Sequence, residues 1–130
     1  PSMNNPTAIS LVVSCDPDLA RLVRMTAANV ATLSSMSVEC VEDIRMAAEE
    51  AFIYACATSP DETLTIDFDV DSTRVAMTFT LEADAFAEPS ADDPTAAYAD
   101  LILGSVCDVY QKVESPARLV LEVKADVDDL

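Results

Sequence analysis

The chain contains a single glycine, Gly104, among 130 residues. Backbone that approaches a phosphate closely, or adopts a positive φ, generally relies on glycine because glycine has no Cβ. Loops that cradle phosphates through successive backbone N–H groups therefore need several glycines. A chain with one glycine cannot build such a loop, and its turns must be made from Asp, Ser and Pro instead.

The composition predicts one domain with an aliphatic core. Hydrophobic residues make up 51% of the chain, whereas aromatic residues make up only 5% and tryptophan is absent. A chain of this length suits one domain. We assign residues 3–125 to that domain, residues 1–2 to an expression remnant before Met3, and residues 126–130 to an acidic tail.

The net charge of −17, from 24 acidic and 7 basic residues, limits the partners of the chain. An acidic surface without a basic stripe repels nucleic acid, and it repels anionic membranes for the same reason. A basic protein partner would instead be attracted and steered. The charge therefore predicts no nucleic acid and no membrane partner, although a role in solubility alone stays open as an explanation of most of it.

Histidine is absent, which removes the commonest general base and the commonest metal ligand. The four cysteines show no CxxC spacing, so we predict no metal site. We interpret them as small buried thiols in a reducing cytoplasm, with a disulfide pair left open. No apolar run has the length of a membrane span, and no signal-peptide pattern opens the chain. The cysteines are Cys15, Cys40, Cys56 and Cys107.

Hydrophobic periodicity predicts alternating helices and strands. Asp16 followed by Pro17 is typical of a helix start, Ser37 is a good N-cap, and Asp71-Ser72 is typical of a hairpin turn. The expected elements are a strand over 8–14, helices over 16–34 and 37–57, strands over 64–70 and 75–81, a loop over 85–94, a helix over 95–109 and a strand over 118–123.

This order, β-α-α-β-β-α-β, predicts an α/β (α+β) two-layer sandwich. In it, a mixed, mostly antiparallel sheet is covered on one face by about three helices. No internal repeat and no linker divide the chain.

The run from Val41 to Ala55 resembles the second helix of bacterial anti-sigma serine kinases, which have the histidine-kinase-like ATPase (Bergerat) fold. The matching positions are Asp43-Ile44, Ala47, Glu50-Ala51 and Ala55. Residues 102–108 resemble the late helix of the family, and the order of elements agrees over nearly the whole chain. The resemblance implies the Bergerat fold, with Glu50 at the position of the catalytic base.

The chain departs from the family at its nucleotide-binding positions. Tyr54 occupies the position of the family's magnesium-binding Asn, and a phenol is a poor magnesium ligand. Asp84 keeps the acid that binds the adenine amino group, but Phe86 stands where the first glycine of that motif would be. Ala97 and Ala99 stand where the family has the two glycines of a Gly-Leu-Gly motif. The resemblance therefore implies a degenerate nucleotide site.

The segment 84–100 carries five acidic residues and no Lys or Arg, which opposes the binding of ATP in the absence of a held cation. We therefore expect no cofactor, and ATP with Mg²⁺ only if the chain is still a kinase. The acids are Asp84, Glu88, Asp92, Asp93 and Asp100.

These observations predict a non-catalytic regulatory protein that binds a sigma factor or an anti-anti-sigma protein, and the family resemblance implies that a homodimer can form. On this interpretation Glu50 is a vestigial rim carboxylate, Tyr54 fills the former pocket, and Asp84 is a turn residue. One alternative is an active anti-sigma serine kinase with an atypical ATP site and Glu50 as its base. Another is an unrelated α/β module with a small-molecule pocket.

Overall fold

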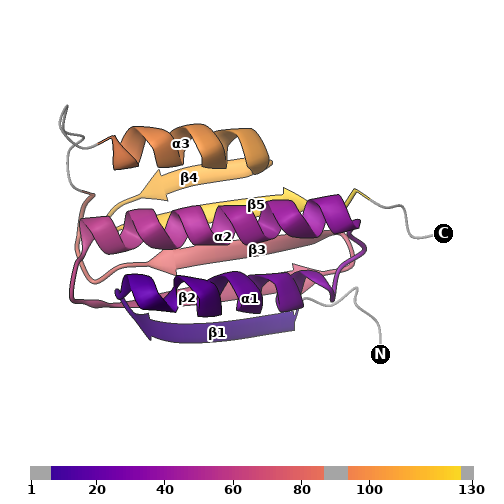
Figure 1. The fold of residues 1–130 in the computed structure, drawn as a ribbon, viewed down its shortest axis with the longest axis horizontal. Helices are drawn as coiled ribbons and strands as arrows, with labels where there is room; N and C mark the ends of the chain where they lie inside the picture. Colours follow the sequence, from indigo (N-terminus) through magenta and orange to yellow (C-terminus); the bar gives the residue numbers. More distant parts are fainter. Residues whose placement is uncertain (1–6, 87–93, 127–130) are drawn as a thin grey trace.

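A computed structural model of the protein describes residues 7–86 and 94–126. Within them the chain forms five strands, three α-helices and one 3-10 turn (Figure 1). In chain order these are β1 (Thr7–Ser14), η1 (Pro17–Leu19), α1 (Ala20–Ala31), α2 (Val38–Thr58), β2 (Thr63–Asp71), β3 (Arg74–Thr80), α3 (Thr95–Val106), β4 (Val109–Val113) and β5 (Arg118–Lys124).

The strands form one sheet in the order β1-β2-β3-β5-β4, and all four pairings are antiparallel. The prediction of a mixed sheet was therefore wrong. The helical pair α1–α2 returns the chain to the end of the sheet where β1 stops, so that Ser14 pairs with Thr63 at the start of β2. Short turns join β2 to β3 and β4 to β5, and two strands joined by a short hairpin turn pair in antiparallel orientation.

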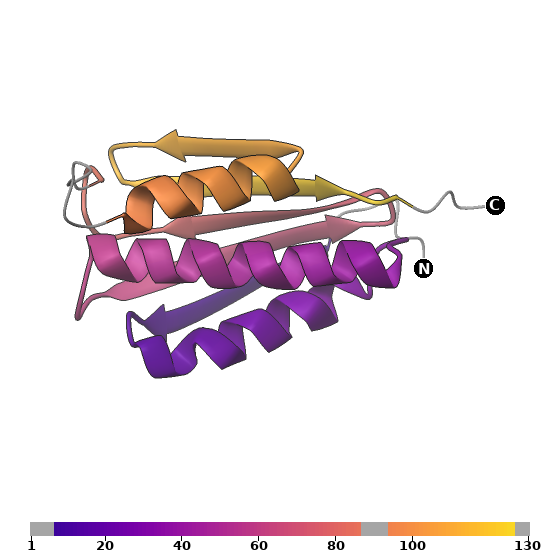
Figure 2. The same cartoon turned by 45° about the horizontal axis from the view of Figure 1, so that its top comes forward.

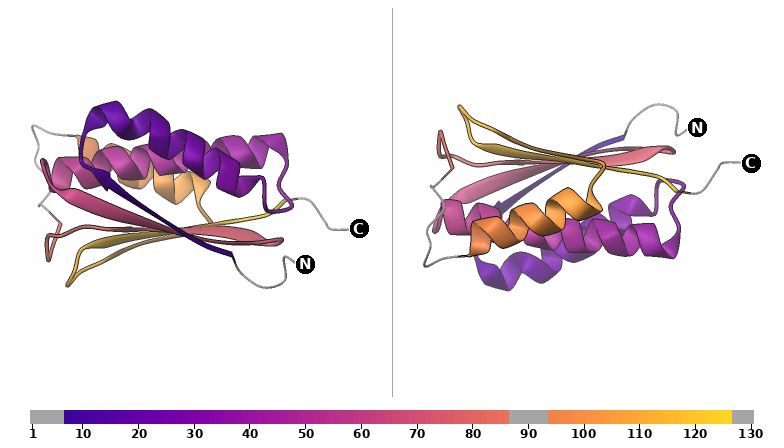
Figure 3. Two further views of the ribbon diagram at one scale, coloured as in Figure 1. Left: turned by 90° about the horizontal axis from the view of Figure 1, so that it is seen from below. Right: turned by 90° about the horizontal axis from the view of Figure 1, so that it is seen from above.

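The three helices lie side by side over one face of the sheet, with α2 between α1 and α3 (Figures 1 and 2). Viewed along the sheet, the molecule has two layers, helices on one side and strands on the other (Figure 3). The coarse prediction of an α+β two-layer arrangement with three helices is confirmed.

The core lies between these two layers because β2 alternates strictly. Leu64, Ile66 and Phe68 are buried on the helical side, whereas Thr65 and Asp67 between them face away. Residues on α2 meet them at helical spacing, among them Ile44, Ala48 and Phe52. Small alanines on α2 let this central helix lie close to the sheet.

Strand β4 was not predicted. The expected helix over 95–109 ends at Val106 because Cys107 is extended, with φ −90° and ψ 143°. Val109, the last residue of that expected helix, instead begins β4 and pairs with Glu122. The run Val109–Val113 is an edge strand with both charged and apolar side chains, and such short strands carry a weak sequence pattern.

The beginning of α1 also differs from its prediction. Asp16 does accept a hydrogen bond from the backbone N–H of Asp18, at 2.9 Å, but the turn that it caps is a 3-10 turn. The α-helix begins at Ala20 and ends at Ala31, three residues before the expected end.

The N-cap of α2 is confirmed, because the Ser37 hydroxyl accepts a hydrogen bond from the N–H of Cys40 at 3.1 Å. Asp126 supports this cap from the other end of the chain. Its carboxylate accepts hydrogen bonds from the N–H of Ser37, at 2.9 Å, and from the Ser37 hydroxyl. Asp126, assigned above to an acidic tail, therefore contacts the folded domain, and residues 127–130 lie outside the described residues, as do residues 1–6.

All four cysteines are free thiols. Cys15, Cys40 and Cys56 are buried, and Cys107 is partly buried, as expected for small apolar residues. None of the helices within residues 7–86 and 94–126 combines the length and the apolar character that a membrane crossing requires.

Candidate functional site

Helix α2 places two of the predicted site residues one turn apart. Glu50 is partly exposed at the surface between α2 and α3, whereas Tyr54 is buried, with 4% of its surface exposed. Residues four apart lie on the same side of a helix, so Glu50 and Tyr54 face the same way. Their exposure differs because different neighbours cover α2 at the two positions. Glu50 lies near the start of α3, whereas Tyr54 lies beneath Phe86 and Lys112.

The ring of Tyr54 stacks on the ring of Phe86. Their centroids are 5.7 Å apart and the ring planes differ by 20°, an ordinary stacking geometry for buried aromatic residues. Phe86 is partly buried against the core, and its N–H donates to the carboxylate of Glu114 at 3.3 Å. The structure thus brings together Tyr54 and Phe86, the two bulky residues that stand in place of an expected Asn and an expected Gly.

Lys112 on β4 lies over the ring of Tyr54. Its Nζ is 5.4 Å from the centroid of the Tyr54 ring and donates a long hydrogen bond of 3.4 Å to the Tyr54 hydroxyl. A cation at this distance from the face of a ring is attracted by its quadrupole. Lys112 also pairs with Asp100 on α3 at 3.1 Å, so a cation lies beside the predicted site although none occurs in the segment 84–100.

The side chain of Asp100 on α3 forms hydrogen bonds with two side chains of β4. Its Oδ1 accepts a hydrogen bond of 2.6 Å from the Tyr110 hydroxyl, and its Oδ2 accepts one from Lys112. Burial, and then the hydrogen bond to this carboxylate, raise the pKa of Tyr110 above its usual range. Burial acts to lower the pKa of Lys112, but its hydrogen bonds to Asp100 and Tyr54 raise it overall. Asp100 is therefore a paired structural acid rather than part of a free acidic loop.

Sequence reasoning missed Lys112 and Tyr110 because their strand was not predicted. Residues 109–113 show no clean alternation of apolar and polar residues, and only the two-residue period of a strand, once the strand is known, places Tyr110 and Lys112 on the same side of β4.

Asp84 is exposed at the surface, and its backbone carbonyl accepts a hydrogen bond of 2.8 Å from the N–H of Ser115. Ala99 is buried at the α2–α3 contact, whereas Ala97 and Tyr98 are exposed. Glu88, Asp92 and Asp93 lie outside the described residues.

Glu50 lines an open cavity of about 370 Å³ between α2 and α3, together with Ile53, Tyr98 and Ala99. Burial, and then the neighbouring charge of Glu49, raise the pKa of Glu50. A carboxyl group with a raised pKa is suited to proton transfer, but nearby Tyr54 offers no hard ligand for a metal ion. Among the described residues, no group of three or more Cys, Asp and Glu side chains is arranged to hold a metal.

Substituting Glu50 with Gln is expected to stabilise the protein at neutral pH by less than about 1 kcal/mol. The folded state binds the Glu50 proton more tightly than the unfolded state does, so wild-type stability falls as the pH rises through the raised pKa. The gain from Glu50→Gln should therefore shrink below about pH 4.5, where both states are protonated. Urea unfolding at several pH values measures this difference.

Glu42→Gln is the matched control, because Glu42 lies on the same helix but forms an exposed ion pair with Arg45 at 2.7 Å. It should give no gain at neutral pH, since loss of an exposed ion pair changes stability little. Equal gains in the two variants would contradict the electrostatic cost assigned to Glu50.

No protein-family model matches this chain, and no curated protein sequence matches it.

Proposed function

We propose that this protein is a non-catalytic regulator of the anti-sigma type, which binds a protein partner without using ATP. The partner would be a sigma factor or an anti-anti-sigma protein, and the fold would be a degenerate form of the histidine-kinase-like ATPase fold. The resemblance of α2, together with three helices over one face of the sheet, supports this assignment. Free, largely buried thiols are in keeping with a role in the cytoplasm.

One observation carries the proposal, namely the stack of Tyr54 on Phe86. If α2 corresponds to the family's second helix, these rings occupy the region where the family holds magnesium and adenine. Two aromatic residues that pack against each other gain contact energy from filling that region, and ATP would have to separate them to bind. The neighbouring Lys112 is already paired with Asp100, so it is not a free cation for phosphate.

Isothermal titration with Mg-ATP tests this proposal. We expect no measurable binding up to about 1 mM nucleotide, a concentration at which an affinity of about −4 kcal/mol would be detected. A sigma factor or anti-anti-sigma protein that binds this chain should do so with the same affinity with and without Mg-ATP. Micromolar binding of Mg-ATP, or a partner affinity that depends on it, would contradict the proposal.

A second candidate function, an active serine kinase with an atypical ATP site, is favoured by one observation. The carboxyl group of Glu50 has a raised pKa and faces a cavity of about 370 Å³, as a general base would. Transfer of labelled phosphate from ATP to a co-encoded partner protein would support it, provided that Glu50→Gln abolishes the transfer. Absence of transfer in the wild-type protein would exclude it for that partner.

A further inference from the structure

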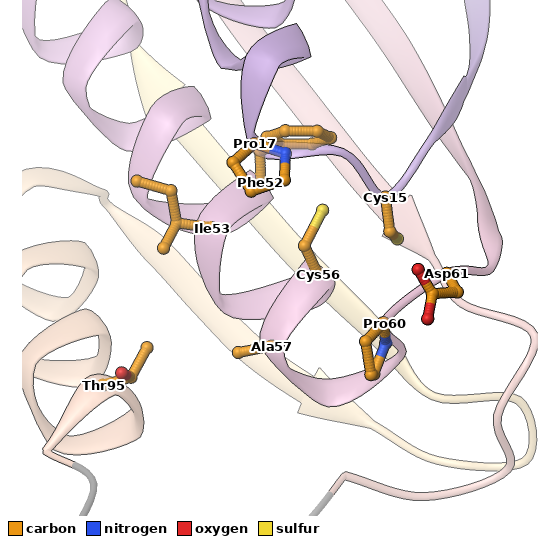
Figure 4. Close-up of a pocket in the computed structure, with 9 residues that line it drawn as sticks. All are labelled: Cys15, Pro17, Phe52, Ile53, Cys56, Ala57, Pro60, Asp61 and Thr95. Atoms are coloured by element: carbon orange, nitrogen blue, oxygen red, sulfur yellow. The ribbon is translucent and has the colours of Figure 1, made fainter.

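Two cavities on the helical layer share a wall. The first, of about 370 Å³, lies between α2 and α3 beside Glu50 and Tyr98. The second, of about 380 Å³, lies at the C-terminal end of α2 and extends to the junction of β1 and η1 (Figure 4). Both are lined by Ile53 and Thr95, so together they form one depression over the second half of α2, which we call the Ile53 groove.

The floor of the Ile53 groove is apolar. Figure 4 shows Ile53 and Cys56 on α2 among the residues that line its second half, with Pro17 and Cys15 on the neighbouring segment, and the fully buried Phe52 also lines it. Burial is the main cause that raises the pKa of both the Cys15 and the Cys56 thiols. Both therefore remain neutral at physiological pH and act as apolar surface.

Large apolar side chains remain exposed at the groove. Ile53 on its floor is 41% exposed, Tyr98 on its wall is 56% exposed, and Leu101 one turn further along α3 is 66% exposed. Contiguous exposed apolar residues of this kind are typical of a surface that a partner covers.

An acidic residue stands at each end of the groove. Glu50 lines the first cavity and Asp61 lines the second, and no Lys or Arg lines either one. Within residues 7–86 and 94–126 neither acid forms an ion pair, whereas the adjacent Glu49 is paired with Arg24 at 3.0 Å. With a net charge of −17 on the whole chain, the groove favours a cationic occupant.

We propose that the Ile53 groove binds a basic amphipathic helix of a partner protein, with aliphatic residues on the groove floor and Lys or Arg at both ends. This inference rests on the proposed protein-binding function and names the surface that serves it. The distance along α2 from Glu50 to Ala57 is about 10 Å at 1.5 Å per residue, which is the length of about two helical turns. Side chains at i, i+3, i+4 and i+7 of a partner helix cover such a length. A small cationic ligand would fill only one of the two cavities.

A synthetic helical peptide of about 14 residues tests the proposal, with Leu at i, i+3, i+4 and i+7 and Lys at both ends. Its binding to the intact chain is measured by fluorescence anisotropy, beside a counterpart in which Glu replaces every Lys. We expect the Lys peptide to bind at least about tenfold more tightly than the Glu peptide. Ile53→Glu should weaken Lys-peptide binding by about tenfold or more, because it places a charge on the apolar floor.

Leu22→Glu is the matched control, since Leu22 on α1 is 48% exposed and lines neither cavity. It should change Lys-peptide binding by less than about twofold. The pair Glu50→Gln and Asp61→Asn should reduce the preference for Lys over Glu, whereas Asp67→Asn on the opposite face of the sheet should not. Circular dichroism melts establish that every variant is folded.

Several results would overturn the proposal. Equal affinity of the Lys and Glu peptides would contradict it, as would a weakening of Lys-peptide binding by Leu22→Glu as large as that by Ile53→Glu. No peptide binding up to about 1 mM, or binding of octylamine without binding of the peptide, would contradict it too. Conversion of a dimer to a monomer by Ile53→Glu, in sedimentation velocity, would assign the groove to a second copy of the chain and also overturn it. The Mg-ATP titration is independent, so peptide selectivity together with ATP binding would remove the non-catalytic function and leave the groove assignment standing.

Discussion

Replacing Tyr54 with alanine is expected to lower the free energy of unfolding by about 3–5 kcal/mol, the usual cost of truncating a buried aromatic residue. The ring is 4% exposed, stacks on Phe86 and has Lys112 over its face, so its removal leaves a cavity in place of these contacts. If Tyr54 only bordered an empty nucleotide pocket, its replacement with alanine would lower the free energy of unfolding far less. Urea denaturation, followed by circular dichroism, measures the difference.

Two further substitutions sharpen this test. Tyr54→Phe keeps the ring and removes only a hydroxyl that accepts a 3.4 Å hydrogen bond, so it should cost less than about 1 kcal/mol. Tyr98→Ala removes a tyrosine that is 56% exposed and should change stability by about 0.5 kcal/mol or less. A loss below about 1 kcal/mol for Tyr54→Ala would show that the ring does not fill the site.

Replacing Asp100 with alanine is expected to cost about 1–3 kcal/mol, because the part-buried Tyr110 hydroxyl loses a charged hydrogen-bond acceptor. The pair with Lys112 adds little, since both side chains are about a third or more exposed. A double-mutant cycle with Tyr110→Phe measures the coupling between the two side chains. A coupling near zero would contradict this account.

The same substitution should change the alkaline behaviour of the protein. Burial and the Asp100 carboxylate raise the pKa of Tyr110, so the folded state keeps this proton when the unfolded state loses it. Wild-type stability therefore falls as the pH rises above about 10, the usual pKa of tyrosine. In Asp100→Ala, Tyr110 should ionise at lower pH, which ultraviolet titration of tyrosinate detects. An unchanged titration would exclude the carboxylate as a cause.

Patterns with strict periods predicted their elements well. Leu64, Ile66 and Phe68 alternate with polar residues, so β2 and its hairpin partner were predicted to within one residue at each end. Ser37 was a correct N-cap, because a hydroxyl with an extended backbone offers its oxygen to the N–H three residues later. These features are local, and a local pattern contains the information that fixes them.

Features that depend on distant contacts were not predictable. Val109 continues the apolar spacing of α3, and only its pairing with Glu122 makes it part of a strand. The role of Asp100 depends on Tyr110 and Lys112, which the fold places beside it. Likewise, Tyr54 and Phe86 were identified separately as departures from a family pattern, but their contact across 32 positions appears only in the folded chain.

The sheet order has a consequence for the moment at which the chain becomes folded during synthesis. β5 is made after β4, yet it lies between β3 and β4, and within residues 7–86 and 94–126 it is the strand that pairs with β4. β4 therefore has no backbone partner while it emerges from the ribosome, and Asp126, which supports the N-cap of α2, follows later still. A nascent chain that ends just before Arg118 contains the residues of β4 but lacks β5, the strand that joins β4 to β3. The five-stranded sheet can therefore close only once β5 has been made, which places the last backbone pairings of the fold late in synthesis.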